Sequence, residues 1–201
     1  MSSILVLAAH PQLEHSRVGR AMMRAADEVP GVQLRDLYAL YPDYSIDVAA
    51  EQAALAQAQL VVWLHPVHWY GMTPLMKLWA DDVLAFGWAY GPGGQVLRGK
   101  DVWLVTSTGG SQQAYHPSGH NRYFFDAFLP PYEQTAMLVG LRFLPPLVLH
   151  GAHRVGQAEL DVHVQTFAAK LASYPDWPEI DTCPACEAVD VPTTDRPETQ
   201  D

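Results

Sequence analysis

An aromatic loop follows one of the apolar runs in the chain. It reads Val67-His68-Trp69-Tyr70-Gly71, and the adjacent rings of Trp69 and Tyr70 would suit a flat, conjugated ligand. Aromatic side chains are also common in protein cores. We therefore assign Trp63 and Trp79 to the core, but expect Trp69 and Tyr70 to bind a ligand at the carboxyl edge of a sheet.

A second group of residues is suited to an anion. Ser16 is a good N-cap for a predicted helix, and the N–H groups of Arg17, Val18 and Gly19 would lie at the positive end of its dipole. A phosphate could bind there, with His10 beside it at the end of the preceding strand. An ordinary N-cap and a packed histidine would explain the same residues without a ligand.

The third group is a turn of small residues with polar side chains after it. A ring could lie flat against the turn and meet N–H donors, although such turns are common; the residues are Ser107, Thr108, Gly109 and Gly110. In the long loop that follows, Tyr115 and His120 could donate protons or hydrogen bonds to a reduced intermediate. His116 competes for the second role, and a solvent-exposed polar loop is the alternative.

Alternating strands and helices must position these three groups. The apolar runs predict strands at 4–9, 32–37, 60–64, 101–106 and 141–150. Helices are expected at 16–27, 48–58, 74–84, 159–172 and after Pro130-Pro131 up to Gly140. This alternation predicts an α/β fold with a flavodoxin-like, five-stranded parallel sheet in the order 2-1-3-4-5 and helices on both faces. Strands 1, 3 and 4 are then neighbours, so the three groups would form one site.

Three local features can be stated for the connections. Proline has no N–H to donate, so His65-Pro66 should end the third strand. Thr73 should cap the helix that begins at Pro74. Residues 38–46 are expected to be irregular.

Composition excludes several classes of protein. The chain has 201 residues, 49% hydrophobic and 17% charged, which is typical of one soluble globular domain. A net charge of −10 without a basic cluster argues against a nucleic-acid partner. Neither G-x-G-x-x-G nor G-x-x-x-x-G-K-[ST] occurs, which argues against a Rossmann dinucleotide fold and a P-loop NTPase. We see no signal peptide or membrane-spanning stretch and expect a cytoplasmic protein.

The C-terminal part of the chain differs in character. We expect one domain over residues 1–175 and an acidic, disordered tail over 176–201, which is rich in proline and poor in apolar residues. Cys183 and Cys186 have the spacing of a redox dithiol or of half a zinc site. No second pair completes four ligands, so we predict no metal site and an accessory role for the pair.

The motifs together resemble a known family over residues 4–172. The chain is similar to the flavodoxin-like NAD(P)H:quinone oxidoreductases and, within them, to the soluble ancillary subunits of glutathione-gated potassium efflux systems. The motifs that carry the resemblance are His10-Pro11 with Ser16, Leu37-Tyr38-x-x-Tyr41-Pro42-Asp43, Asp47-x-Ala49-x-Glu51-Gln52, His65-Pro66-x-x-Trp69-Tyr70, Pro74-Leu75-x-Lys77-Leu78-Trp79, Gly87-Trp88-Ala89-Tyr90-Gly91 and Thr108-Gly109-Gly110.

The resemblance implies a flavin, FMN or FAD, with NADPH or NADH as co-substrate and a quinone as acceptor. His10 and Ser16 to Gly19 would bind the phosphate, and Val67 to Tyr70 with Ser107 to Gly110 would hold the isoalloxazine. Tyr115 and His120 match residues that assist hydride transfer, and Trp88 and Tyr90 match a lid that crosses a homodimer interface. Gly19 departs from the family, which often has Asn there.

Three functional hypotheses remain open at this stage. The first is a quinone reductase that transfers two electrons as hydride, with both substrates using one face of the flavin in turn. The second is a regulatory flavoprotein that docks on the cytoplasmic side of a potassium–proton antiporter, with or without catalysis. The third is a flavodoxin-type electron carrier, which the acidic charge also suits.

Overall fold

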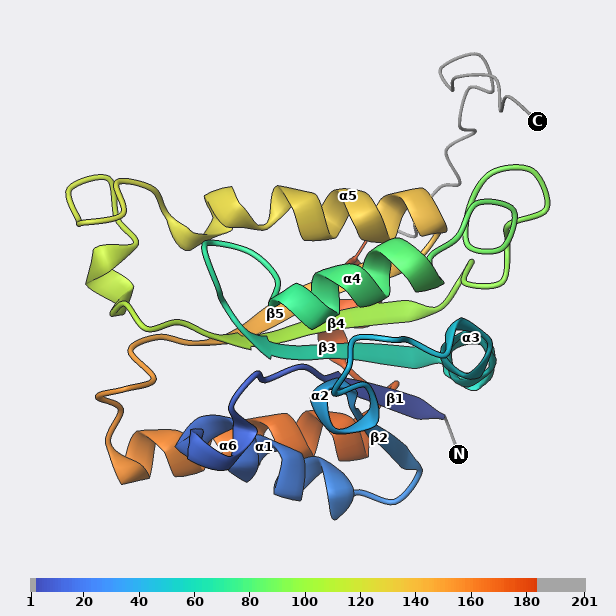
Figure 1. The fold of residues 1–201 in the computed structure, drawn as a ribbon. Helices are drawn as coiled ribbons and strands as arrows, with labels where there is room; N and C mark the ends of the chain where they lie inside the picture. The colour runs from blue at the N-terminus through green and yellow to red at the C-terminus, as the bar shows by residue number, and fades with distance from the viewer. Residues whose placement is uncertain (1–2, 184–201) are drawn as a thin grey trace.

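The computed structural model describes residues 3–183 and contains a sheet of five parallel strands. The strands lie in the order β2-β1-β3-β4-β5 (Figure 1), which confirms the predicted flavodoxin-like topology. β1, β3 and β4 are almost wholly buried, as expected where helices cover both faces of a parallel sheet. The strands are β1 (Ile4–Ala8), β2 (Val32–Asp36), β3 (Leu60–Pro66), β4 (Asp101–Ser107) and β5 (Arg142–Leu149).

Helices form one layer on each face of the sheet. The helices α1 (Arg17–Asp27) and α6 (Gln157–Ser173) cover one face, and α4 (Pro74–Val83) and α5 (Pro130–Val139) cover the other (Figure 1). The shorter helices are α2 (Leu37–Leu40), α3 (Val48–Gln57) and α7 (Pro178–Thr182), with 3-10 turns η1 (Leu13–His15), η2 (Gln112–Ala114) and η3 (Phe125–Phe128). None of the helices between residues 3 and 183 is long and apolar enough to cross a bilayer.

The third strand is longer than predicted. His65 pairs with Thr106 and Pro66 pairs with Ser107, so β3 does not end at Leu64. The next residue, Val67, donates its N–H to Ser107 at 2.8 Å, which places the nitrogen of Pro66 on the other side of the strand. β1 has already ended at Ala8 on that side, so the proline removes no ladder hydrogen bond.

Thr73 also differs from the prediction, because it makes no side-chain cap on α4. Its buried hydroxyl donates to the carbonyl of Ala9 at 3.1 Å and ties the start of α4 to the loop after β1. The stretch expected to be irregular begins with α2, which Asp36 caps by accepting from the N–H groups of Tyr38 and Ala39. Both corrections concern polar side chains whose partners decide the local structure.

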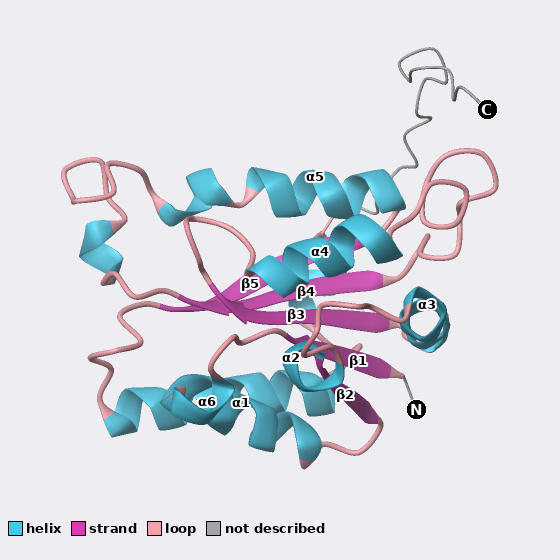
Figure 2. Ribbon diagram, in the orientation of Figure 1, coloured by secondary structure: helices cyan, strands magenta, loops and turns pink. Residues whose placement is uncertain are grey.

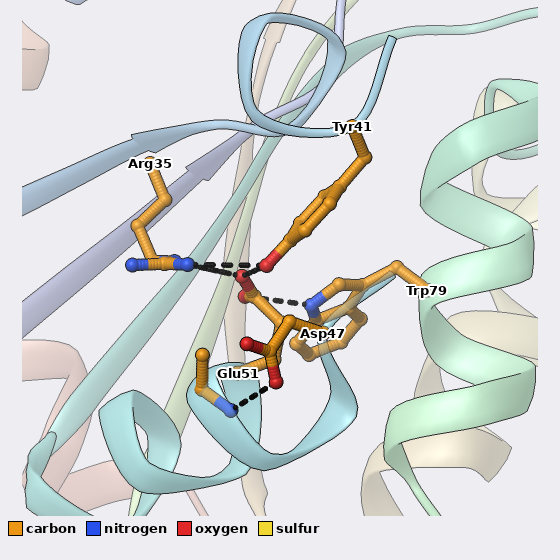
Figure 3. A network of polar contacts seen from close by, with 6 residues as sticks. Arg35, Tyr41, Asp47, Glu51 and Trp79 are labelled. Atoms are coloured by element: carbon orange, nitrogen blue, oxygen red, sulfur yellow. Dashed lines mark hydrogen bonds and ion pairs between the residues drawn. The ribbon is translucent and has the colours of Figure 1, made fainter. Parts of the chain in front are cut away.

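A buried carboxylate joins the elements beside β2 (Figure 3). Glu51 on α3 is fully buried and accepts from Arg35 Nε at 2.8 Å, from the Tyr41 hydroxyl at 2.6 Å and from Trp79 Nε1 at 2.9 Å. Asp47 caps the same helix through the N–H of Ala50. Glu51 therefore connects β2, the end of α2 and α4 through one charged group.

The packed part of the chain continues past the expected boundary at residue 175. Trp177 is 4% exposed, and its ring lies 4.8 Å from that of Trp103 on β4. Arg142 donates to the carbonyl of Ile180 at 3.1 Å, which holds α7 against the start of β5. Residues 184–201, including Cys186, lie outside the described residues.

Candidate functional site

The loops after β1, β3 and β4 meet at the carboxyl edge of the sheet. Figure 2 shows these loops in pink at the left of the sheet, where the arrowheads end. A cleft of about 710 Å³ opens between them. Most of the predicted cofactor-binding residues line it: His10, Ser16, Arg17, Val18, Val67, His68, Ser107, Thr108 and Gly109. This edge lies at the switch point between β1 and β3, where ligands bind in open α/β sheets.

The N-terminus of α1 forms one end of the cleft. Ser16 caps the helix, and its hydroxyl oxygen accepts from Gly19 N at 2.9 Å. The N–H groups of Arg17 and Val18, in the first turn, have no helical acceptor and can serve an anion, as can the hydroxyl hydrogen of Ser16. The Arg17 guanidinium does not face the anion position through this contact, because it donates a hydrogen bond to the carbonyl of Val155.

Gly19 faces a small apolar cavity beneath this helix end. A Cβ at this position would lie 3.0 Å from both Leu13 Cδ1 and Ser16 Oγ. Glycine therefore allows η1 and the Ser16 cap to pack closely, which gives a physical reason for the departure from the family pattern.

Histidines surround the cleft, and sequence reasoning identified only two of them. His10 and His68 were predicted, whereas His15 and His153 line the same space without having been singled out. Burial, together with His68, lowers the pKa of His10, so His10 is a neutral hydrogen-bonding group at neutral pH. Its Nδ1 accepts the N–H of Gln12 at 3.1 Å, which leaves Nε2 as the protonated nitrogen.

The aromatic loop is a strained two-residue turn. His68 and Gly71 pair as an antiparallel bridge, and both residues between them have positive φ, 49° for Trp69 and 65° for Tyr70. Such turns favour Asn and Gly, and a bulky side chain is strained there. Trp69 is 95% exposed, so its own packing does not offset the strain. An aromatic pair held this way points to binding, because backbone strain persists where function requires it.

The turn after β4 is fixed by backbone contacts to the last residue of β5 and to the segment that follows it. Thr108 N donates to Leu149 O at 2.9 Å, and Gly151 N donates to Gly110 O at 2.8 Å. Thr108 is buried, its hydroxyl bonds to Gly110 O at 2.7 Å, and its carbonyl accepts from Ala152 N at 2.9 Å, so its polar groups serve the turn itself. Within residues 3–183, the N–H groups of Gly109 and Gly110 have no acceptor, and that of Gly109 belongs to the cleft lining.

Tyr115 and His120 lie in one loop but differ in exposure. Tyr115 is buried, and burial raises the pKa of its phenol. His120 is exposed in the same loop, and the imidazole beside Tyr115 is that of His150, with ring centroids 5.4 Å apart. The end of β5 next to β4 would have suggested His150, since strand ends at one edge converge. The catalytic roles of Tyr115 and His120 stay predictions.

The lid residues of the resemblance lie elsewhere. Trp88 and Tyr90 belong to the loop between α4 and β4, at the end of the sheet opposite the cleft (Figure 1). Tyr90 also lines a groove of about 570 Å³ along α4 and α5 that includes Trp69 and Tyr70.

The residues fit a flat ligand that carries a phosphate. Amide donors at α1 suit the phosphate, and the N–H of Gly109 suits a ring heteroatom. Trp69 and Tyr70 do not line the cleft but the groove along α4 and α5, which meets it at His68, and the exposed ring of Trp69 is suited to stacking there. These features match the demands of a flavin nucleotide.

Sequence relatives share this architecture over nearly their whole length. The family model for the flavodoxin-like fold matches residues 2–173. The glutathione-regulated potassium-efflux system ancillary protein KefF of Citrobacter koseri is 42% identical over 171 residues, which cover 85% of this chain and 96% of the relative.

Solved structures agree with the fold. A protein named as a thermophilic tryptophan halogenase from Streptomycin violaceusniger superimposes with a TM-score of 0.80 and 40% identity, covering 83% of this chain and 97% of its own. General stress protein 14 of Treponema denticola, solved in complex with FMN, superimposes with a TM-score of 0.78 and 32% identity, covering 84% of this chain and 97% of its own. A candidate quinone reductase from Klebsiella pneumoniae superimposes with a TM-score of 0.74 and 25% identity, covering 90% of this chain and 87% of its own.

The printed names of these three proteins point to different activities, but all three share the fold of this chain. One of them was solved in complex with FMN. The match of the family model over most of the chain and the 42% identity to a KefF protein are each sufficient to establish kinship. The chain therefore belongs to the flavodoxin-like fold family and is a relative of the KefF ancillary proteins.

Proposed function

We propose that this protein is a flavin-dependent oxidoreductase that uses NADPH or NADH to reduce a quinone by two electrons. The observation that carries the proposal is the cleft at the switch point, which is lined by the α1 N-terminus and by Gly109, whose N–H has no acceptor among the described residues. Amide donors at both places would hold a flavin nucleotide by its phosphate and by its ring. Support comes from a relative of 32% identity whose structure contains FMN.

The chain's own residues would bind and orient the reactants. A bound flavin supplies the hydride chemistry, which no protein side chain can perform. Ser16 and the N–H groups of Arg17 and Val18 would hold the phosphate, and His10 would donate a hydrogen bond to it from Nε2. The turn at Trp69 would cover one edge of the ring. Nicotinamide and quinone would occupy the same cleft in turn, so we expect an alternating mechanism.

Tyr115 would assist by donating a hydrogen bond. Burial raises the pKa of its phenol, so the hydroxyl keeps its proton at neutral pH and can stabilise negative charge that develops nearby. His120 is the second assisting residue that the resemblance implies. Its exposure would require the loop or a second subunit to cover it during the reaction.

A homodimer is part of the proposal. The loop that carries Trp88 and Tyr90 lies away from the cleft of its own chain, so a lid made by these residues would have to act on a second copy. Analytical ultracentrifugation of the purified protein would test this point. A monomer at micromolar concentration with full activity would contradict it.

A visible absorption spectrum of freshly purified protein tests the proposed activity. We expect a flavin spectrum that bleaches on anaerobic addition of NADPH and returns on addition of menadione. A flavin that NADPH and NADH leave unchanged would contradict the reductase, and a stable one-electron-reduced form on titration would favour an electron carrier. Protein that cannot be reconstituted with FMN or FAD would contradict the cofactor itself.

A second candidate function rests on the name of the relative. KefF proteins are ancillary to a glutathione-regulated potassium-efflux system, and the match covers 96% of the Citrobacter protein. By this proposal the chain docks on the cytoplasmic face of a potassium–proton antiporter and promotes efflux, with its redox activity retained. Co-purification with the antiporter tests the contact. Normal potassium efflux in a deletion strain would contradict the regulatory role.

A further inference from the structure

His150 lies directly after β5, behind the turn that follows β4. Its Nδ1 is 3.0 Å from Thr108 Oγ1, across 42 residues of sequence. Its ring lies 5.4 Å from that of Tyr115 and 5.3 Å from that of Phe125, measured between centroids. His150 therefore touches both the turn predicted to hold the flavin ring and the tyrosine predicted to assist the reaction.

The direction of the hydrogen bond between His150 and Thr108 follows from counting protons. The Thr108 hydroxyl has one hydrogen, and at 2.7 Å from the carbonyl of Gly110 it must donate there, since two acceptors would repel at that distance. The hydrogen in the contact with His150 must then come from the imidazole. Neutral His150 is accordingly protonated on Nδ1 and carries its lone pair on Nε2.

A chain of two hydrogen bonds results, from His150 to the Thr108 hydroxyl and from that hydroxyl to the carbonyl of Gly110. The end of this chain, Gly110 O, also accepts from Gly151 N at 2.8 Å, so the carbonyl is held away from the cleft by two donors. The N–H of Gly109 shares a peptide plane with the carbonyl of Thr108, which accepts from Ala152 N at 2.9 Å. The Thr108 hydroxyl then ties this end of the turn to the carbonyl of Gly110. The backbone bonds hold the turn in place, and the side-chain bond adds to its orientation.

We propose that His150 is a positioning residue that sets the orientation of the Thr108–Gly110 turn and supports the ring of Tyr115. The part that concerns flavin rests on the proposed function, whereas the hydrogen-bond chain does not. His150 touches no reacting atom in this account and acts only through Thr108 and Tyr115.

Four variants separate the hydrogen bond from simple packing. In His150→Asn the amide can replace Nδ1–H as a donor, whereas His150→Leu fills space without one. Thr108→Val removes the hydroxyl, and Phe125→Leu alters the packing around the imidazole without touching the hydrogen bond. We expect His150→Leu and Thr108→Val each to raise the Kd for FMN by about threefold to tenfold, the range of one lost hydrogen bond, and the double variant to do no more. His150→Asn should stay closer to the wild type than either.

Nitrogen-15 NMR of the flavin-free protein gives a readout that does not depend on cofactor or activity. We expect His150 to show a protonated Nδ1 and an unprotonated Nε2, and Thr108→Val to lose this preference. An Nε2–H form in the wild type, or additive effects of His150→Leu and Thr108→Val, would overturn the role of His150. Wild-type protein that shows the expected tautomer but binds neither FMN nor FAD would instead overturn the proposed function.

Discussion

The indole of Trp79 donates a hydrogen bond of 2.9 Å to Oε2 of Glu51, while Arg35 and Tyr41 bond to Oε1 of the same carboxylate. Glu51 is fully buried, and the side chain of Arg35 is 17% exposed. A buried charge without its partner is strongly destabilising. The carboxylate is therefore expected to matter for folding even though it lies away from the cleft.

Glu51→Gln keeps the shape of the side chain and removes its charge. We expect the free energy of unfolding to fall by about 3 kcal/mol, because the guanidinium of Arg35 loses its partner. Urea denaturation measures the change. Glu133→Gln, at an exposed position on α5, is the matched control and should stay within about 0.5 kcal/mol of the wild type. Equal stability of the two variants would contradict the role of the network.

Replacing Trp69 should separate stability from binding. Its φ of 49° is strained for an aromatic residue, and its side chain is 95% exposed. Trp69→Asn puts a residue that tolerates this conformation into the turn, so the free energy of unfolding should rise by about 1 kcal/mol. Flavin affinity, measured by fluorescence titration, should fall.

Trp69→Ala is the control for that change, because alanine removes the ring without relieving the strain. It should weaken flavin binding without the gain in stability. If Trp69→Asn instead lowered stability and left the affinity unchanged, the aromatic turn would not be a binding element.

His65 should make folding sensitive to acid. Burial lowers the pKa of His65 from 6.5 to about 4, and the ring stacks on Tyr132. Between these two values the unfolded chain binds more protons than the folded one, so stability falls as the pH drops. The full loss amounts to about 3 kcal/mol below pH 4. Urea denaturation at pH 7 and pH 4.5 measures the larger part of this loss, because pH 4.5 lies near the lower of the two pKa values.

His65→Phe retains an aromatic ring against Tyr132 and cannot titrate. Its stability should therefore fall less than that of the wild type between pH 7 and pH 4.5. Burial also lowers the pKa values of His10, His150 and His163, so part of the acid sensitivity should remain. An unchanged pH dependence in His65→Phe would show that His65 is not the main titrating group.

Much of the fold follows from sequence alone, because alternation of apolar runs with helices leaves few topologies. The same reasoning brought the loops at His10, Val67 and Ser107 to one edge, where the structure has its cleft. Both rest on short-range periodicity and on a general rule of parallel sheets. The strand order was therefore predictable without any side-chain geometry.

Partners far apart in sequence could not be predicted. Glu51 meets Trp79 across 28 residues, and Thr108 meets His150 across 42, so neither contact leaves a local signal. Pro66 was predicted to end the third strand because proline has no N–H to donate. The missing N–H matters only where a neighbouring strand could accept it, and β1 has already ended on that side. The positive φ of Trp69 could not be predicted either, since Trp is not among the residues that favour such turns.

The boundary of the folded domain can be located by truncation. Trp177 is buried against Trp103, and Arg142 holds the carbonyl of Ile180. A chain that ends at residue 175 should lose about 3 kcal/mol or more of unfolding free energy, the range for removal of a buried Trp. A chain that ends at residue 183 keeps these contacts and should match the full-length protein. Thermal denaturation compares the three, and equal stability of both truncations would place the boundary at 175 after all.

Tyr115→Phe tests the chemistry without disturbing the packing. Tyr115 packs against Phe125, Phe128 and His150, and these ring contacts survive the loss of one hydroxyl. If the phenol donates a hydrogen bond during hydride transfer, kcat for quinone reduction should fall by about 100-fold while flavin affinity changes little. Stopped-flow reduction of the flavin by NADPH, and its reoxidation by a quinone, assigns the loss to one half-reaction. Tyr123→Phe, at an exposed position in the same segment, is the matched control.

His120→Gln belongs in the same experiment, because it tests whether the tyrosine works with that histidine. A loss similar to that of Tyr115→Phe would support the pair, and would mean that exposed His120 moves toward the cleft when substrates bind. Unchanged turnover in His120→Gln, with a loss in Tyr115→Phe, would leave the phenol as the sole assisting group, supported from behind by His150. Unchanged turnover in both variants would remove the loop after β4 from the mechanism and leave the cleft residues to orient the reactants alone.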